Sequence, residues 1–549
     1  MKVLVLDIET NLAHDTIWCC GFKADWKVTP NPVVTQRGGE LQELIQEADV
    51  VVGHNIIGFD GPLLSKLWSI TIPLHKVRDT LVMSRLLNPQ LEDGHSLRAW
   101  GQRLGNSKDD FTDFDGGLTD EMVKYCLQDV NVTYDLFKKL TIDLRDFGNS
   151  VWLEHQIAFL MKKQEDNGFK LNEKEALSLL AQLKDRMAYI TDAMQTIFTP
   201  IVEERWSEKT GKRLKDKVTV FNVGSRQQIA TRLQIRGVKF TKKTEKGSVI
   251  VDEGTLKAID LPEAQLIAEY LMIQKRVGLL ESWIDSLKDD NRVHGRVITN
   301  GAVTGRMTHQ KPNMGQIPSV SSEYGQECRE LWTVDNGNVL VGTDLSGIEL
   351  RCLAHYMRDD EWTQELLNGD IHTKNQLAAG LETRAQAKTM VYATLYGAGP
   401  AKIGSIVGGG AREGSIILDK FYKNTPALRK LLDKVKVSYG TNGYLPGLDG
   451  RRIIVRSEHA ALNSLLQSCG AIIAKQWCIE AHAVFKKFRI PVRQVVFVHD
   501  EIQIETEEKY SKQVAEIMIQ SAAKAGTALG FRCPVDAESK IGKTWFDTH

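Results

Sequence analysis

The pattern of hydrophobic and polar positions predicts a small α/β domain at the start of the chain. Short apolar, β-branched runs at VLVLDIE (3–9) and VVGHN (51–55) predict buried strands. Segments 61–88 and 118–140 have the apolar spacing of helices. The pattern breaks at RDFGNS, so we place the end of this domain near residue 148.

Helical periodicity dominates the middle of the chain, and a mixed pattern follows. Residues 151–197 and 254–289 repeat apolar positions at the helix period, and the stretch between them contains the turn-forming strings GSR and EKGS. VLVGTDLS (339–346) predicts a strand that runs into a turn, residues 360–440 are mostly helical, and VRQVVFVHDEIQIET (492–506) predicts a strand, a turn and a strand. We therefore expect a helical, basic middle region and a larger α+β domain.

Composition agrees with several globular domains. The chain has 549 residues, of which 42% are hydrophobic and 26% charged, which excludes wholesale disorder. No run approaches the roughly 18 apolar residues of a membrane helix, and Asp7 and Glu9 interrupt what would be the core of a signal peptide. We expect a cytoplasmic protein. Eight cysteines without a C-x-x-C pair argue against a disulfide scaffold or structural zinc.

Charge is balanced overall but unevenly distributed. The chain has 70 basic and 70 acidic residues, yet residues 205–246, here called the basic block, contain 13 Lys or Arg against 3 Asp or Glu. Residues 1–145 instead contain 21 acidic against 15 basic residues. A local basic block is typical of phosphate binding, although a solvated charged face would have the same composition.

A first set of carboxylates lies in the N-terminal domain. Asp7 and Glu9 are two residues apart on a strand, so they point to one face. Asp60 follows the next strand, and Asp129 lies in a helical segment four residues after Tyr125, on the same helix face. Clustered carboxylates repel one another unless they hold cations, and hard oxygen ligands suit Mg²⁺ or Mn²⁺.

Taken in order, these five residues resemble the proofreading 3′→5′ exonucleases. The resemblance implies that the four carboxylates bind the metals and that Tyr125 orients the attacking water. A pair of such ions about 3.5–4 Å apart activates water and stabilises the leaving oxygen in phosphodiester hydrolysis.

A second set of carboxylates lies in the larger domain. Asp344 ends a predicted strand, and Asp500 lies in the turn of the strand–turn–strand pattern, so the two could meet at one sheet edge. The strings DLSGIELR (344–351), RAQAKTMVYATLYG (384–397) and VHDE (498–501) resemble motifs A, B and C of family A DNA polymerases.

The spacing in the second of these strings has a physical basis. Arg384, Lys388, Tyr392 and Tyr396 are each four residues apart and would form one stripe along a helix. Its two cations can hold a triphosphate, and its aromatic rings can meet a base and a sugar.

The resemblance covers nearly the whole chain. Strings such as NGAVTGRMTH, NGDIHTKNQ, HAALNSLLQS and EYLMIQKR are similar to the replicative polymerases of T-seven-type bacteriophages within family A. It implies a ribonuclease-H-like exonuclease domain followed by a right hand, used in phage genome replication. The expected divisions are an exonuclease domain (1–148), a helical and basic thumb with the palm entry (149–326), the first part of the palm (327–358), the fingers (359–445) and the second part of the palm (446–549).

The resemblance also implies the ligands of the polymerase metals. Asp344 and Asp500 would bind two catalytic Mg²⁺ ions, for which Mn²⁺ would substitute, and Leu345 would contribute its backbone carbonyl. Glu501 belongs to the same motif, but the resemblance does not assign it a metal.

Further roles follow from the same resemblance. His372, Arg384 and Lys388 would bind the phosphates of a dNTP, and Lys388 would also protonate the departing pyrophosphate. Glu349 would exclude a ribose 2′-hydroxyl, Tyr392 would allow dideoxynucleotides to be incorporated readily, and Tyr396 would stack near the templating position. The positions that would touch the primer–template are Arg306, Asn313, Gln316, Gln467 and His499.

The chain departs from the phage enzymes in its thumb. Those enzymes carry an inserted loop that binds host thioredoxin, whereas residues 200–220 form only a short basic stretch, which argues against thioredoxin dependence. The basic block would replace that partner by direct phosphate contact. A replicative helicase–primase is a further candidate partner.

Two alternatives remain open at this point. The chain could be chiefly a 3′→5′ exonuclease with a degenerate polymerase domain, or a DNA-binding scaffold without catalysis. Both predict the loss of some metal carboxylates, and all of them are present. Primer lengthening that depends on dNTPs distinguishes the three hypotheses.

Overall fold

A sheet of order β3-β2-β1-β4-β5 lies at the centre of the N-terminal domain. The computed structural model describes residues 1–27, 31–106, 111–241, 243–244 and 247–549. The strands of this domain are β1 (Val3–Thr10), β2 (Ile17–Ala24), β3 (Val33–Thr35), β4 (Val50–Gly53) and β5 (Val77–Asp79). Its helices are α1 (Gly38–Glu47), α2 (Asp60–Trp68), η1 (Leu74–Lys76), α3 (Thr80–Leu87), α4 (Leu97–Arg103) and α5 (Asp120–Asp143).

Strand β1 is buried on both faces, and each face has its own core. Leu4, Leu6 and Ile8 pack with the residues of α1 and α2, whereas Val3 and Val5 pack with those of α3, α4 and α5. Asp7 and Glu9 continue the second series, because side chains alternate along a strand. The alternation therefore turns both carboxylates toward α5.

The predicted helical segment 61–88 is not a single helix. It divides into α2 and α3, with η1 and the short strand β5 between them. Pro73 precedes η1, where a proline ring ends helical continuity. The β-branched Val77 then pairs in parallel with Val51 on β4. The prediction of helix over 118–140 is confirmed by α5.

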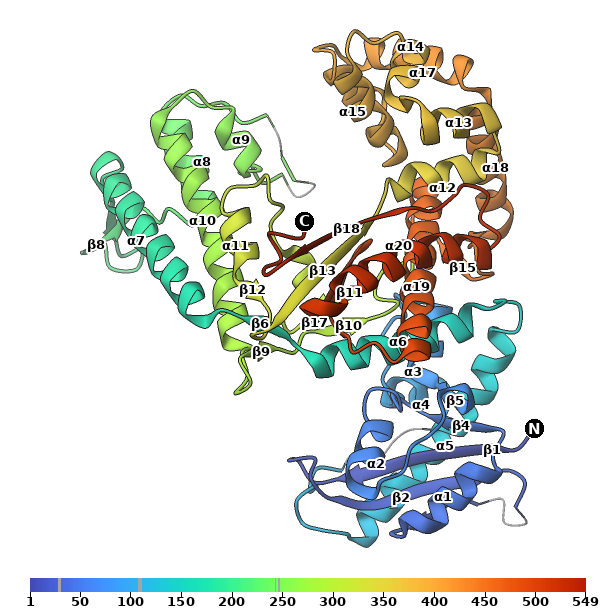
Figure 1. Cartoon of the computed structure of the whole chain (residues 1–549). Coiled ribbons are helices and arrows are strands. Elements are labelled where there is room, and N and C mark those ends of the chain that lie inside the picture. Colours follow the sequence, from blue (N-terminus) through green and yellow to red (C-terminus); the bar gives the residue numbers. More distant parts are fainter. Residues whose placement is uncertain (28–30, 107–110, 242, 245–246) are drawn as a thin grey trace.

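The thumb lobe follows the N-terminal domain and is built on long helices (Figure 1). Helices α7 and α10 pack against each other around a shared apolar core, which confirms the helical periodicity of the middle region. Its helices are α6 (Ser150–Asn167), α7 (Glu173–Ile197), α8 (Arg226–Ile235), α9 (Glu253–Lys257), α10 (Pro262–Asp285), η2 (Met314–Gln316) and α11 (Gly325–Glu330). Its strands are β6 (Phe169–Leu171), β7 (Ile201–Trp206), β8 (Arg213–Thr219), β9 (Arg292–Val293), β10 (Arg296–Ile298), β11 (Thr308–Gln310) and β12 (Trp332–Thr333).

An antiparallel hairpin that the sequence pattern did not predict lies across the start of the basic block. Strands β7 and β8 pair with each other, and their side chains are exposed or half-buried. The string GSR is not simply a turn, because the Ser225 side chain caps α8 by accepting a hydrogen bond from the Gln228 amide. Within the block, Lys242, Glu245 and Lys246 lie outside the described residues.

Two further lobes complete the chain, and we call them the palm and the fingers after the expected divisions. The palm contains β13 (Asn338–Leu345), α12 (Ile348–Met357), β14 (Tyr444–Pro446), β15 (Arg452–Ile454), η3 (Glu458–Ala460), α19 (Ala461–Phe488), β16 (Arg493–Val498), β17 (Glu501–Glu507), η4 (Glu508–Tyr510), α20 (Ser511–Ala528) and β18 (Ala537–Gly542). The fingers contain α13 (Asp360–Asn368), α14 (Ile371–Ala379), α15 (Arg384–Leu395), α16 (Pro400–Ser405), α17 (Ala411–Asn424) and α18 (Pro426–Asn442). The predicted strands at 339–346 and 492–506 and the helical run at 360–440 are confirmed.

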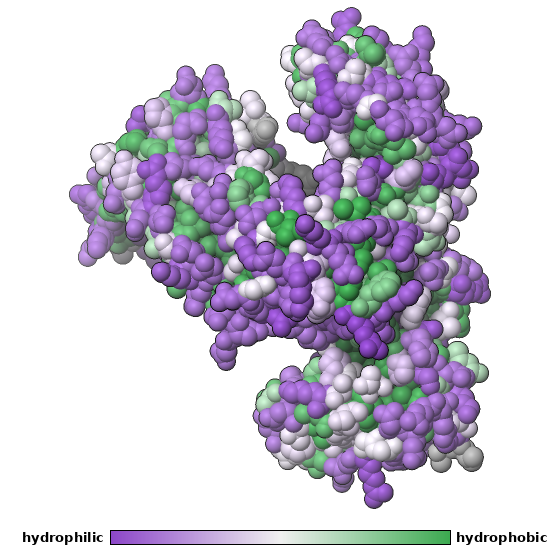
Figure 2. Space-filling view, in the orientation of Figure 1, coloured by the Kyte–Doolittle hydropathy of each residue, from purple (hydrophilic) through white to green (hydrophobic). Residues whose placement is uncertain are grey.

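The palm sheet has the order β16-β17-β13-β18, and its neighbouring strands are antiparallel. Helices α19 and α20 pack together, and α20 also contacts β13 and β18, so both helices support the sheet from behind. Figure 2 shows a deep hollow between the thumb and fingers lobes above this sheet. The sequence-based prediction of a small α/β domain followed by a larger α+β hand is confirmed.

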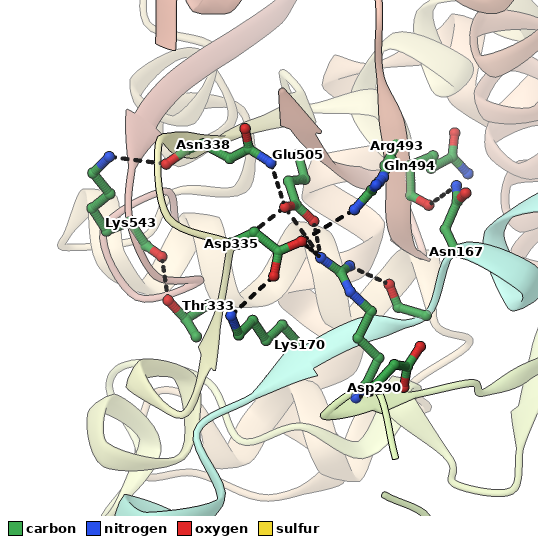
Figure 3. Close-up of polar contacts among 12 residues, drawn as sticks. Asn167, Lys170, Asp290, Thr333, Asp335, Asn338, Arg493, Gln494, Glu505 and Lys543 are labelled. Carbon is green, nitrogen blue, oxygen red and sulfur yellow. Dashed lines mark hydrogen bonds and ion pairs between the residues drawn. The ribbon is translucent and has the colours of Figure 1, made fainter. Parts of the chain in front are cut away.

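A cluster of ion pairs fastens the base of the thumb to the palm sheet (Figure 3). The buried Arg292 of β9 lies 2.8 Å from Glu505 on β17 and 2.6 Å from Asp335. Asp335 also accepts a hydrogen bond from Lys170 on β6, at 2.9 Å. Asn338 completes the group by donating to Glu505 at 2.7 Å. The charges are thus paired across three strands and a loop, and they join the two lobes at their base.

Two further features concern the state of the cysteines and the apolar character of the helices. All eight cysteines are buried free thiols. Among the described residues, none of the helices combines the length and the apolar character needed to cross a bilayer.

Candidate active sites

The first carboxylate set lies where α5 crosses β1 and β2. Asp7 and Glu9 pair across the sheet with Gly21 and Cys19, so the four positions share one face. A side chain at Gly21 would bring its Cβ to 2.7 Å from the Cys126 sulfur on α5. Glycine at this position therefore lets α5 lie close to the strand that carries the carboxylates.

Asp60 and Asp129 join this set from two helices. Asp60 is the first residue of α2, is 2% exposed, and accepts a hydrogen bond from the Ile8 amide at 3.2 Å. Burial raises the pKa of Asp60 to about 7, and the carboxylates of Asp79 and Asp129 add to the shift. Asp129 is 4% exposed on α5. The repulsion among these buried carboxylates favours a bound cation at this place.

Tyr125 lies one helical turn before Asp129, as the spacing predicted. It is half-buried, and its ring packs against Phe111 and Phe114, with centroid distances of 5.5 and 6.2 Å. This aromatic group fixes the ring at the rim of the first set.

Cys126 is a member of this site that sequence reasoning missed. Its sulfur and one carboxylate oxygen each of Asp7 and Glu9 all lie within 4.8 Å of one another. The Cys126 thiol also donates a weak hydrogen bond to the Asp7 carbonyl oxygen, at 3.7 Å. A signal was available, because Cys126 is three residues before Asp129 and thus on the same helix face.

The second carboxylate set lies at one edge of the palm sheet. Asp344, on β13, pairs directly with Glu501 on β17, and the Leu345 amide donates to the Asp500 carbonyl at 3.1 Å. Asp500 lies in the turn between β16 and β17, where His499 has φ of 56°. This left-handed residue allows the tight reversal that brings Asp500 beside Asp344.

The electrostatics of this edge also favour a cation. The protein around Asp344 removes much of its water, although one side of the residue is open to solvent. This desolvation, together with the carboxylates of Asp500 and Glu501, raises the pKa of Asp344 to about 8. Burial likewise raises the pKa of Asp500. A divalent cation held by these oxygens would relieve both effects.

Glu501 has a different environment from Asp344 and Asp500. Burial alone would raise the pKa of Glu501, but hydrogen bonds from His549, Gln503 and Trp545 lower it. Gln503 donates at 2.7 Å and His549 lies at 3.1 Å. The Glu501 side chain therefore fastens the last residues of the chain to the palm sheet.

The predicted cation–aromatic stripe lies on α15 and its C-cap. Arg384, Lys388 and Tyr392 lie on this helix, which Thr383 begins with a reciprocal capping box. Tyr396 caps the C-terminal end of the helix, its amide donates to the Tyr392 carbonyl at 3.0 Å, and its side chain is 51% exposed. The helix ends where LYGAG begins, because Gly397 adopts φ of 76°.

His372 and the two cations of α15 lie together above the palm. Arg384 pairs at 2.7 Å with Asp370, which caps α14 and so fixes His372 beside the α15 helix. The positive charges of Arg384 and Lys388, added to burial, lower the pKa of His372. The ring of His372 is 6.3 Å from that of Tyr392. This arrangement offers a polyphosphate several cationic or hydrogen-bonding partners.

Glu349 links the predicted sugar site to two other lobes. It lies in the first turn of α12, 3.4 Å from the Arg306 guanidinium, and it accepts a hydrogen bond from the Tyr396 hydroxyl at 2.8 Å. Sequence reasoning placed Arg306 and Tyr396 against DNA but did not connect either with Glu349.

The remaining predicted DNA-contact residues lie at η2 and on α19. The Asn313 side chain caps η2, and Asn313 and Gln316 line a cavity of about 530 Å³ together with Lys275 and Arg276 of the thumb. Gln467 is half-buried on α19. His309 was not predicted, yet burial and the nearby His499 lower its pKa to about 4.

Comparison with known proteins extends these observations to the whole chain. The family model described as DNA polymerase family A matches residues 199–547. The chain is 34% identical to the DNA-directed DNA polymerase of Enterobacteria phage T3 over 706 positions, and 33% identical to that of Escherichia phage T7 over 709 positions. Each alignment covers 100% of both chains.

The fold is also similar to a solved structure. The POL domain of Pol1 from M. smegmatis, in complex with DNA primer-template and dNTP, matches with a TM-score of 0.82 and 18% identity. The match covers 99% of this chain and 95% of that chain, so the two share a fold.

Proposed function

Because this chain belongs to DNA polymerase family A and is a DNA-directed DNA polymerase, we propose that its palm carboxylates perform the synthesis and its N-terminal carboxylates proofread the product. Family A polymerases are metal-dependent enzymes. The observation that supports the palm assignment is the juxtaposition of Asp344 and Asp500 at the open end of the sheet, with raised pKa values for both carboxyls.

The palm residues fit a pair of Mg²⁺ ions. Asp344 and Asp500 offer carboxylate oxygens, and the Leu345 carbonyl is a further oxygen donor, which is the ligand chemistry that Mg²⁺ prefers. When bound, Mg²⁺ supplies Lewis-acid activation of the primer 3′-hydroxyl and neutralises charge on the triphosphate. Mn²⁺ has similar ligand preferences and would substitute.

The fingers residues bind and orient the incoming dNTP. Arg384, Lys388 and His372 hold the triphosphate, and Lys388 provides a proton for the departing pyrophosphate. Lys388 is exposed on α15, one helical turn after Arg384. Asp370 keeps the Arg384 guanidinium in place until phosphate arrives.

Residues around α12 and at the end of α15 select the sugar and the base of the incoming nucleotide. Glu349 blocks the 2′ position of the sugar, and Tyr392 lies beside the 3′ position. The exposed Tyr396 ring stacks near the templating base while its hydroxyl remains bonded to Glu349.

The primer–template lies in the hollow between thumb and fingers. Minor-groove acceptors are present in every base pair, so polar side chains there sense pairing geometry without reading sequence. The side chains assigned to this role are Arg306, Asn313, Gln316, Gln467 and His499.

Primer extension tests the palm assignment directly. Asp344→Asn and Asp500→Asn should each reduce dNTP-dependent extension by roughly a thousandfold or more, because several kcal/mol of transition-state stabilisation depend on the metals. Asp536→Asn is the matched control, since this exposed carboxylate lies at the same sheet edge and should leave extension intact. Extension that survives in Asp344→Asn would overturn the assignment.

The proofreading proposal rests on the convergence of Asp7, Glu9 and Asp60 beneath α5. These carboxylates and Asp129 fit Mg²⁺ for the same reason as the palm pair, and Tyr125 orients the water that attacks the terminal phosphodiester. In Mg²⁺ without dNTPs, the chain should shorten a primer with a mismatched 3′ end. Asp7→Asn and Glu9→Gln should lose shortening and keep extension. A mismatched primer that is never shortened would refute this second activity.

Thioredoxin independence follows from the thumb. Between α7 and α8 the chain forms only the β7–β8 hairpin, and its alignments to the phage T3 and T7 enzymes run over 706 and 709 positions although the chain has 549 residues. Extension of one primer on a long circular template, with a trap for released enzyme, should give equal product lengths with and without thioredoxin. A replicative helicase–primase is a further proposed partner, and the same extension assay on duplex DNA would test it.

A further inference from the structure

The thiol of Cys126 lies beside the carboxylates of Asp7 and Glu9 in the N-terminal site. The Cys126 sulfur and the nearest oxygens of Asp7 and Glu9 are mutually within 4.8 Å. Cys126 is fully buried, whereas Asp7 is half-buried and forms the open side of the group. An ion that enters past Asp7 therefore meets two carboxylates and then the sulfur.

The position of this sulfur is fixed by its surroundings. It lies against the backbone at Gly21, where even one added carbon would be 2.7 Å away. Its thiol interacts with the Cys19 thiol on β2 and with the Asp7 carbonyl, at 3.7 Å for the latter. Cys126 cannot rotate away from the carboxylates without losing these contacts.

The spacing suits one ion with mixed ligands. A zinc ion lies about 2.3 Å from a thiolate and about 2.0–2.2 Å from a carboxylate oxygen, so the ligand atoms of a tetrahedral ion are about 3.4–3.6 Å apart. The three ligand atoms, which lie within 4.8 Å of one another, therefore have to move closer together by up to about 1.2 Å as the ion binds. Mg²⁺ takes oxygen ligands and gains nothing from the sulfur, whereas thiophilic cations bind it strongly.

We propose that Cys126, Asp7 and Glu9 form a mixed thiolate–carboxylate site that binds a thiophilic divalent cation of the zinc class in preference to Mg²⁺. The sulfur loses its proton as its bond to the metal forms. An ion bound there occupies the place of Mg²⁺ and inhibits shortening of the primer 3′ end. This consequence of the inference rests on the proposed proofreading activity. DNA synthesis at the palm continues under the same conditions.

Cadmium titration of the full chain tests the site without reference to activity. A Cd²⁺–thiolate bond produces a charge-transfer band in the ultraviolet, and wild-type protein should show one equivalent of it. Cys126→Ser should lose the band. Cys478→Ser is the matched control, because Cys478 is buried on α19 and donates to Gln494 at 3.3 Å, a bond that serine can make. It should keep the band. An unchanged band in Cys126→Ser would overturn the proposal.

Zinc inhibition tests the consequence. In Mg²⁺ with added Zn²⁺, wild-type chain should stop shortening a mismatched primer at zinc concentrations roughly 10–100-fold lower than Cys126→Ser requires. Primer extension by the same samples reports whether each variant is folded, and Cys126→Ala replaces the serine variant if that one is inactive in extension. If zinc inhibits primer shortening equally in wild type and in Cys126→Ser, the proposal that the Cys126 site causes the inhibition is overturned. If the cadmium band depends on Cys126 but the chain never shortens primers, the metal site stands and the proofreading function is refuted.

Discussion

The ammonium group of Lys475 lies 2.6 Å from the carboxylate of Glu154, and the two side chains are 1% and 0% exposed. This buried pair joins α19 of the palm to α6, which follows the N-terminal domain. Arg451 contacts the same Glu154 oxygen at 2.6 Å. Lys475 also donates at 2.8 Å to the carbonyl of Gly305, the neighbour of Arg306. The network therefore positions the loop that carries Arg306 into the hollow.

Lys475→Met should destabilise the chain by about 3–5 kcal/mol, because it leaves the Glu154 and Gly305 oxygens without this buried partner. The urea midpoint of unfolding, followed by tryptophan fluorescence, measures the change. Lys436→Met is the control, since its pair with Glu458 is 66% and 50% exposed and should contribute less than about 1 kcal/mol. Equal midpoints for the two variants would contradict the assigned strength of the network.

Glu349→Ala should weaken the exclusion of ribonucleotides by roughly 10–100-fold, because it removes the side chain assigned to the 2′ position and releases Arg306 and Tyr396. Single-nucleotide insertion kinetics with matched dNTP and rNTP give the ratio of kcat/KM values. Glu361→Gln on the exposed side of α13 serves as control. A ratio that stays at the wild-type value would remove Glu349 from this role.

Tyr392→Phe should reduce incorporation of dideoxynucleotides relative to dNTPs by about tenfold or more, which corresponds to about 1.4 kcal/mol of transition-state free energy. Burial raises the pKa of Tyr392, and the carboxylates of Glu349 and Asp500 add to the shift, so Tyr392 lies on the side of α15 that faces these two residues. Chain-termination assays at fixed nucleotide ratios measure the effect. The prediction fails if termination is as frequent in the variant as in wild type.

Gly21→Ala should reduce shortening of a mismatched primer by about tenfold and leave extension unchanged. The new Cβ would lie 2.7 Å from the Cys126 sulfur and 3.1 Å from Val130, so α5 must shift with Asp129 and Tyr125, and misplacement by about 1 Å is costly in catalysis. Gly39→Ala is the matched control, because its added carbon meets nothing within 4 Å. A loss of extension in Gly21→Ala would show that the damage is not confined to this site.

His155 should make stability depend on pH. Burial lowers the pKa of His155 to about 4, and its ring accepts from the Asp79 amide at 2.7 Å. The unfolded chain binds a proton near pH 6.5 and the folded chain does not, so stability falls as pH decreases from about 6.5 to 4, by about 3 kcal/mol in total. Unfolding midpoints over this range should have a smaller slope in His155→Gln. Identical slopes would contradict the assignment.

Local sequence patterns were sufficient to predict features that depend only on neighbouring residues. The i, i+4 spacing of Tyr125 and Asp129 predicted one face of α5, and the apolar run before Asp344 predicted β13. These features depend on backbone periodicity, which few neighbouring residues determine. The exposed β7–β8 hairpin escaped detection, because strands that bury neither face have no hydrophobic alternation.

Only the tertiary structure decided which distant residues meet. The sequence showed Cys126 and Asp7 in separate segments, and their contact depends on how closely α5 packs over Gly21. Likewise, Glu154 and Lys475 are 321 positions apart and pair through the docking of α6 on α19. Such contacts are fixed by packing of whole elements, since a displacement of a few ångströms would separate them while leaving every local pattern unchanged. The sequence by itself thus determined the elements, the order of the motifs and the kind of chemistry, and tertiary packing determined the members of each site.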